Sequence, residues 1–416
     1  MWRLWCIGAD MANVMYLVHR MPYPPNKGDK VRSFHMLEQL LQNHRVFLGT
    51  FLDDPADEEH VPGLASMCAE LHLERLKRPW STLRALRGVV QNKPLSVSHY
   101  ASSSMRQWVR TTLTQHHMDA CVVVSSPMAA YLMPDPQLTR NLILDLVDVD
   151  SQKWRRISAA KRWPMSWVLR REAGLLLGHE RKAVMAARQS FLVTERETQL
   201  FESVAPECRG RVQTMGNGVD SAFFAVSHAC ASPFPSGEQA VVFVGTMDYW
   251  PNIDAIQWFA SEVLPALRKT CPAAVLHVVG RNPAPEVLAL ASPAVRITGT
   301  VPDVRPFLQY ASAVVAPMRV SPGLPNKLLE ALAMQQPVVT TPGCALAIDS
   351  YERAGVLVAD GTDAWVDQVR RLLTQPERKL VLGGLARQHV LSHFRWADRL
   401  APLRRSLLVD QEGESK

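Results

Sequence analysis

The stretch SPGLPNKLLEALAMQQPVVTT, Ser321–Thr341, contains a turn, a helix and a strand in close succession. Its proline and glycine residues predict a turn that opens a helix over Asn326–Met334. The helix is amphipathic, and the apolar run that begins at Pro337 predicts a strand buried on both faces. A helix that leads directly into a buried strand is typical of an α/β fold with a parallel sheet.

The same alternation extends outward along the chain. In the C-terminal half, strands are predicted at Ala240–Gly245, Ala274–Gly280, Val295–Gly299, Ala313–Met318, Pro337–Thr341 and Val356–Ala359, with helices at Asn252–Lys269, Glu286–Leu290, Val304–Tyr310 and Thr362–Thr374. In the N-terminal half, strands are predicted at Asn13–His19, Val46–Phe51, Leu71–Leu76, Ala120–Ser125, Asn141–Val147, Ser190–Thr194 and Arg211–Met215, with helices at Lys30–Gln42, Trp154–Arg188 and Glu195–Val204. Each half therefore predicts a doubly wound, Rossmann-like sheet.

The length of 416 residues predicts two domains, because single hydrophobic cores stop growing near ~250–300 residues. The Ser/Pro/Ala/Gly-rich segment 216–238 is the expected linker, between an N-terminal domain at 11–215 and a C-terminal domain at 239–390. The tail, 391–416, contains an amphipathic helix expected to pack back toward the N-terminal domain. Ligands of doubly wound sheets bind outside the carboxyl ends of the strands, so the active site is expected in a cleft between the two domains.

The net charge of +7 comes from one segment. Residues 153–188 contain ten Lys/Arg and two Glu, which gives 10 − 2 = +8, so the rest of the chain sums to 7 − 8 = −1. One interpretation is contact with an anionic membrane surface; the other is a helix pair packed on the N-terminal domain with its arginines outward. The membrane interpretation uses Arg155, Arg156, Trp163, Trp167, Arg170 and Arg171. No stacking platform or recognition motif accompanies the charge, so nucleic acid is not an expected partner.

Seven cysteines without a CxxC pair predict reduced thiols in a cytosolic protein. No apolar run reaches the ~18–20 residues of a membrane-spanning helix. The apolar start Met1–Val18 is interrupted by Asp10 and Asn13, which argues against a signal peptide and favours a first strand opening at Met11 or Met15. The expected location is the cytoplasm. If the basic segment 153–188 contacts an anionic membrane, the protein is attached peripherally to the inner face of the plasma membrane.

The start of the helix at Asn326 suits a diphosphate, because a helix N-terminus carries unpaired N–H groups and partial positive charge. Lys327 adds a point charge there, and Glu330, one turn on, can accept hydrogen bonds from ribose hydroxyls. An amphipathic helix with an ordinary surface lysine and glutamate is the equally weighted alternative. The GxGxxG, GxxxxGK[ST] and GxSxG motifs are absent, which removes support for dinucleotide oxidoreductases, P-loop enzymes and α/β-hydrolases.

Several segments, in order, carry a family resemblance: PYPPNKGDKVRSFHML, ILDLVDVDSQKW, NGVD, FVGTMDYWPNIDAIQWFASEVLP and NKLLEALAM followed by PVV. The chain resembles GT-B glycosyltransferases of the retaining family-four group over about Val14–Leu408. The greatest resemblance is to the sugar transferases associated with exosortase (PEP-CTERM) and exopolysaccharide systems. The resemblance implies sugar transfer, with retention, from a nucleotide-diphosphate-sugar to a glycan or polyprenyl-linked acceptor, without a metal or other cofactor.

The resemblance also implies site residues. Donor-binding positions are Gly245, Asn252, Asn326, Lys327, Leu328 and Glu330; acceptor-loop positions are Lys27, Gly28, Asp29 and Lys30; Asp148, Lys327 and Glu330 are the expected catalytic residues. The chain departs from the pattern at Pro322, where the family usually has the first of two glutamates, and lacks a basic pair within Thr246–Asn252.

The triplet Asp148-Val149-Asp150 also matches the short metal-binding DxD signature, an alternative that a manganese requirement would support. Two other functions stay open: a GT-B nucleotide-sugar epimerase, which needs no acceptor, and a weakly active partner in a polysaccharide assembly complex.

Overall fold

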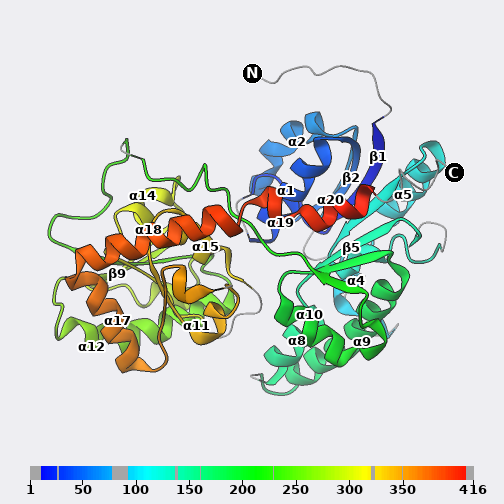
Figure 1. The fold of residues 1–416 in the computed structure, drawn as a ribbon. Helices are drawn as coiled ribbons and strands as arrows, with labels where there is room; N and C mark the ends of the chain where they lie inside the picture. The colour runs from blue at the N-terminus through cyan, green and yellow to red at the C-terminus, as the bar shows by residue number, and fades with distance from the viewer. Residues whose placement is uncertain are drawn as a thin grey trace. The chain divides into compact units, whose positions relative to one another are not determined.

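A computed structural model of the chain describes residues 11–25, 28–76, 92–135, 139–159, 161–227, 229–319, 324–348 and 350–408. The chain forms two compact units: unit 1 is Met1–Gly216 with Leu400–Lys416, and unit 2 is Asn217–Arg399. Each unit contains one parallel sheet with helices packed on it (Figure 1). The predicted α/β class with two Rossmann-like sheets is confirmed.

The sheet of unit 1 has the strand order β3-β2-β1-β4-β5-β6-β7. Its strands are β1 (Ala12–Val18), β2 (His44–Leu52), β3 (Glu70–Arg75), β4 (Ala120–Val124), β5 (Leu142–Val147), β6 (Gln189–Leu192) and β7 (Val212–Thr214). All neighbouring pairs are parallel. The strand order reverses between β1 and β4, the place where doubly wound sheets bind their ligands. The central strands are apolar on both faces because helices cover both sides.

The helices of unit 1 are α1 (Gly28–Leu41), α2 (Val61–Met67), α4 (Leu95–His99), α5 (Ser103–Gln115), α6 (Ser126–Ala129), α8 (Asp150–Ala159), α9 (Met165–Ala186), α10 (Glu195–Val204) and α20 (Ala401–Leu408), with short 3-10 turns at Pro55–His60 and Pro206–Cys208. Side-chain caps fix two of the starts. The Ser102 hydroxyl accepts from the backbone N–H of Met105 at 3.2 Å, and the Thr194 hydroxyl accepts from that of Glu197 at 3.2 Å.

The helix predicted over Trp154–Arg188 is two helices, α8 and α9. Pro164 precedes the first residue of α9. A proline lacks a backbone N–H, and its ring clashes with the preceding turn of a helix, so one continuous helix cannot pass through this position. The segment is therefore a helical hairpin with an exposed tip.

Unit 2 contains a sheet with the strand order β10-β9-β8-β11-β12-β13, which reverses between β8 and β11. Its strands are β8 (Gln239–Val244), β9 (Ala274–Val279), β10 (Val295–Gly299), β11 (Ala313–Ala316), β12 (Val338–Thr340) and β13 (Val356–Val358). Its helices are α11 (Trp250–Trp258), α12 (Leu264–Arg268), α13 (Pro285–Leu288), α14 (Arg305–Gln309), α15 (Asn326–Ala333), α16 (Pro342–Ala345), α17 (Thr362–Thr374), α18 (Pro376–His393) and α19 (Trp396–Arg399), with a π turn at Phe259–Val263 and a 3-10 turn at Tyr351–Arg353.

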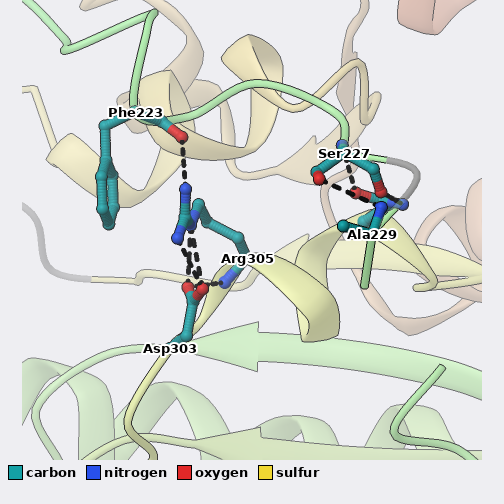
Figure 2. A network of polar contacts seen from close by, with 6 residues as sticks. Phe223, Ser227, Ala229, Asp303 and Arg305 are labelled. Atoms are coloured by element: carbon teal, nitrogen blue, oxygen red, sulfur yellow. Dashed lines mark hydrogen bonds and ion pairs between the residues drawn. The ribbon is translucent and has the colours of Figure 1, made fainter. Parts of the chain in front are cut away.

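The segment expected to be the linker is fastened to unit 2 through α14 (Figure 2). Arg305 forms an ion pair with Asp303 at 2.8 Å, and its Nη1 donates to the backbone carbonyl of Phe223 at 3.2 Å. The guanidinium also lies 4.1 Å from the centre of the Phe223 ring. Gln309 exchanges two hydrogen bonds with the backbone of Ser227, at 2.9 and 2.8 Å. These contacts make the chain from Asn217 onward part of unit 2.

The second boundary also differs from the sequence expectation. The expected division at residue 390 falls inside α18, which continues to His393. The backbone N–H of Val219 then donates to the carbonyl of Phe394 at 2.8 Å, and unit 2 extends to Arg399. The α20 segment belongs to unit 1, where the Arg188 guanidinium donates to the backbone carbonyl of Ser406. Among the described helices, none has the length and apolar character required to cross a bilayer.

Candidate functional site in unit 2

Two glycines bring the ends of β8 and β9 into direct contact. The backbone N–H of Gly245 donates to the Val279 carbonyl at 3.0 Å. Gly280 has φ +150°, and a Cβ there would lie 1.7 Å from the Gly245 carbonyl oxygen. A Cβ on Gly245 would lie 2.8 Å from both Lys327 Nζ and Asn252 Nδ2. Glycine is therefore required at position 280, and at position 245 a side chain would displace Lys327 and Asn252, at the edge where such sheets bind ligands.

Asn252 connects this edge to α15. Its Nδ2 donates to the Thr246 carbonyl at 2.8 Å, and its Oδ1 accepts from Lys327 Nζ at 2.8 Å. The side chain is 4% exposed, so its orientation is fixed by these two bonds. Asn252 lies in the first turn of α11, and it holds the ammonium of Lys327 beside Gly245.

Lys327 is a cation with no ion-pair partner among the described residues. Besides Asn252, its Nζ lies 4.0 Å from the centre of the Phe243 ring, a cation–π contact. Burial lowers the pKa of Lys327 to about 7, although the charge of Glu330 acts in the opposite direction. Burial likewise raises the pKa of Glu330 to about 7, opposed by Lys327. Both groups change charge close to neutral pH, as is common at ligand sites.

The start of α15 is anchored from the beginning of unit 2. Asn217 Nδ2 donates to Asn326 Oδ1 at 2.9 Å, so the NGVD segment positions the first residue of the helix. Leu328 is fully buried in the core of unit 2, so its side chain is not available to a ligand. Pro322, where the chain departs from the family pattern, lies outside the described residues.

In unit 1, Asp148 follows a strained turn at the carboxyl end of β5. Val147 has φ +67°, and the Asp148 N–H donates to the Leu146 carbonyl at 2.9 Å, which closes a three-residue turn. Positive φ at a β-branched residue costs energy and often marks a functional edge. Burial raises the pKa of Asp148 to about 7; Lys153 opposes this shift, while Asp150 and Glu197 add to it.

The acidic residues around Asp148 are engaged by protein groups. Glu197 Oε2 accepts from the Val149 N–H at 2.9 Å. Glu180 accepts from Ser151, at 3.1 Å from the backbone N–H and 2.5 Å from the hydroxyl, and burial raises the pKa of Glu180 to about 8. In the described ranges no group of three or more His, Cys, Asp or Glu side chains could hold a metal ion, so the DxD triplet gains no third ligand there.

Two charged residues of α1 are buried and paired. Arg32 forms two bonds with Asp145, at 2.6 and 2.9 Å, with both side chains at most 1% exposed. Lys30 is fully buried in an ion pair with Asp57. Lys30 was expected in the acceptor loop, and the structure places its ammonium in this ion pair inside unit 1.

The remaining acceptor-loop positions are only partly described. Gly28 is exposed and begins α1, Lys27 lies outside the described residues, and the side chain of Asp29 is not described.

Arg32, Asp145 and Gly280 were not among the predicted site residues. Asp145 was detectable, because it interrupts the apolar run ILDLV of a strand predicted to be buried. Gly280 was detectable as the glycine that ends the predicted strand Ala274–Gly280. Arg32 carried no signal of its own.

Among known proteins, a family model matches part of unit 2. Residues 238–375, which are 138 of the 416 residues, match the family model described as Glycosyl transferases group 1. The match includes Gly245, Asn252 and the whole of α15. No similar sequence is found among the curated proteins.

Solved structures with the same fold cover nearly the whole chain. Anabaena Alr3699/HepE, solved with UDP and glucose, is 12% identical over 95% of this chain and 99% of its own, with a TM-score of 0.62. WaaG, a glycosyltransferase involved in lipopolysaccharide biosynthesis, is 17% identical over 94% and 98%, with a TM-score of 0.62. A glycosyltransferase from Rickettsia africae is 11% identical over 97% and 100%, with a TM-score of 0.66.

At these identities the structural likeness establishes the GT-B fold. The family match covers the segment that contains the glycine edge and Lys327. Residues 238–375, about a third of the chain, are similar to the glycosyl transferases group 1 family.

Proposed function

We propose that the chain transfers a sugar, with retention, from a nucleotide-diphosphate-sugar to a glycan or polyprenyl-linked acceptor in exopolysaccharide or cell-surface polysaccharide synthesis. The observation that carries the donor assignment is the Lys327 ammonium, which has an amide and an aromatic ring as partners and lies beside Gly245. A half-buried cation without a counter-ion is costly, and a diphosphate would supply the missing charge.

The chemistry follows from the same groups. Cleavage of the sugar–phosphate bond develops negative charge on the diphosphate, and Lys327 with the N-terminus of α15 stabilises that charge. Gly245 has no side chain, so its backbone can approach the phosphates. Glu330, one turn further along α15, accepts hydrogen bonds from the ribose. Positive charge at the diphosphate then comes from the protein, without a metal ion.

Asp148 is the proposed acceptor contact in unit 1. Its pKa of about 7 lets the carboxyl group accept or donate a hydrogen bond near neutral pH. The strained turn at Val147 holds the residue at the carboxyl edge of β5. Uridine nucleotides are the first donors to test, because the Anabaena protein of the same fold was solved with UDP-glucose.

The donor assignment is tested by calorimetric titration of UDP, GDP, ADP and their sugars into the full chain. One nucleotide should bind, and Lys327→Met should weaken it roughly 10–100-fold, since hydrogen bonds to charged groups contribute about 1.5–3 kcal/mol. Lys327→Arg keeps the charge and should lose less.

Lys269→Met is the matched control, because Lys269 is an exposed lysine of unit 2 away from the glycine edge. Unchanged affinity in Lys327→Met, or no binding of any nucleotide by the native chain, would count against the assignment. Conversion of the donor sugar without any acceptor would point to an epimerase instead.

A further inference from the structure

The tip of the α8–α9 hairpin exposes three large apolar side chains within five residues. Trp163 is 80% exposed, and Met165 and Trp167 are each 52% exposed. Trp163 has the highest exposure of any large apolar side chain in the described ranges. Clustered exposure of this kind marks an interaction surface, because water disfavours apolar area that has no packing partner.

The same tip carries unbalanced positive charge. Arg155 and Arg156 are exposed on α8, Lys161 and Arg162 lie in the connection, and Arg170 is exposed on α9. The described ion pairs of segment 153–188 involve Lys153 with Asp150 and Arg181 with Glu207, and none of the five tip cations.

The two acidic residues of α9 do not neutralise the tip. Glu172 is buried and accepts from Leu95 and Ser96, at distances from 2.5 to 2.9 Å. Glu180 is buried and bonded to Ser151. Arg171 was predicted to contact the membrane. It is partly buried and donates to the Asn92 side chain at 3.3 Å, which places it on the inner side of α9.

Between α8 and α9, which pack against each other (Figure 1), lies an open cavity of about 380 Å³. Its lining consists of three cations, two hydroxyl residues and one alanine: Arg155, Lys161, Arg170, Ser158, Ser166 and Ala159. The lining contains no carboxylate. The volume is more than ten times the ~30 Å³ share of one water molecule, so a phosphodiester group can enter.

We propose that this tip docks on a bilayer containing anionic phospholipid. A lipid phosphate occupies the cavity between Arg155, Lys161 and Arg170, and Trp163 and Trp167 lie in the headgroup region. The combination of exposed tryptophans with cations is what favours a bilayer: tryptophan prefers the membrane–water interface, while the cations are attracted to anionic headgroups.

A nucleic acid would provide charge but no apolar phase for Trp163, Met165 and Trp167. The attachment is peripheral. It is independent of the donor site, because every residue involved belongs to unit 1.

The test is flotation of the full chain with phosphatidylcholine vesicles, with and without phosphatidylglycerol. We expect binding only to the anionic vesicles, weakening as salt rises. Removing three cations, as in Arg155→Gln/Lys161→Gln/Arg170→Gln, should weaken binding roughly 100-fold, since each basic residue near the surface contributes about fivefold. Trp163→Ser/Trp167→Ser should weaken binding with little change in its salt dependence.

The matched control is Arg110→Gln/Arg209→Gln/Arg211→Gln, which removes the same charge from exposed positions of unit 1 outside the tip. Equal loss in the control and the tip variant would overturn the proposal, as would equal binding to neutral vesicles. Competition by inorganic phosphate without any vesicle dependence would show an anion site instead of a membrane site. Nucleotide titration of each variant reports on unit 2 separately, so failure of the donor assignment and failure of membrane docking are distinguishable.

Discussion

The two sheets end differently at their carboxyl edges. In unit 1 the charged groups near β5 are bonded within the protein: Arg32 donates to Asp145, and Glu197 and Glu180 accept from backbone and hydroxyl groups. In unit 2 the edge at β8 and β9 has two glycines and a lysine held by an asparagine. An edge whose cation is already paired offers nothing to a diphosphate, whereas an edge with an uncompensated cation and exposed backbone is suited to an anionic ligand.

The largest expected effect is on the stability of unit 1. Arg32→Met leaves the Asp145 carboxylate buried without a cation, which costs about 3–5 kcal/mol of unfolding free energy. Chemical denaturation of the full chain measures this change. The double variant Arg32→Met/Asp145→Asn has no buried charge and keeps an acceptor for the Val147 N–H, which lies 3.3 Å from Asp145 Oδ1. It should lose less than the single variant; an equal loss would mean that the ion pair is not what stabilises this edge.

An intermediate effect is expected at Gly245, on ligand affinity instead of stability. In Gly245→Ala the added Cβ displaces Lys327 Nζ and Asn252 Nδ2, both of which it would approach within 2.8 Å. Donor affinity should fall roughly tenfold while the unfolding free energy changes by less than about 1 kcal/mol, because long side chains can shift. The control is Gly174→Ala in unit 1, because a Cβ added there meets open space. Gly237→Ala is not a suitable control, because its φ of +81° would strain an alanine. Titration of the donor into both variants separates the outcomes.

The smallest expected effect is the pH dependence of donor binding. Lys327 has a pKa of about 7 in the free protein, so it loses its proton as pH rises above 7, and a bound diphosphate favours the protonated form. Binding therefore takes up a proton, and affinity should fall by up to about fivefold between pH 7 and pH 8.

A nucleotide-sugar is the right probe for this titration, because its diphosphate keeps a constant charge in this range. Lys327→Met should flatten most of the profile. A steep profile that persists in Lys327→Met would assign the proton to another group.

The alternation of apolar runs and helices was sufficient to predict both sheets, because strands buried on both faces are apolar at nearly every position. It was also sufficient to place Lys327 and Glu330 on one helix. The burial of Lys30 and Arg32 could not be predicted, because their partners lie 27 and 113 residues away in the chain. Pro164 was visible in the sequence, but the apolar pattern continues on both sides of it, so one helix was predicted where the structure has two. The boundary at Arg399 had no signal, since α18, α19 and α20 follow one another with little interruption.

The arrangement of unit 1, with its last helix encoded after unit 2, affects the order in which the protein is completed during synthesis. Residues 217–399 form unit 2 and separate Gly216 from Leu400. At ~5–20 residues per second, the ribosome needs about 10–40 s to make those 183 residues. During that interval the nascent chain holds the sheet of unit 1 without α20 and without the bond from Arg188 to Ser406. Unit 2, which is continuous in sequence, can fold first as a complete body, and unit 1 is finished last although it begins first.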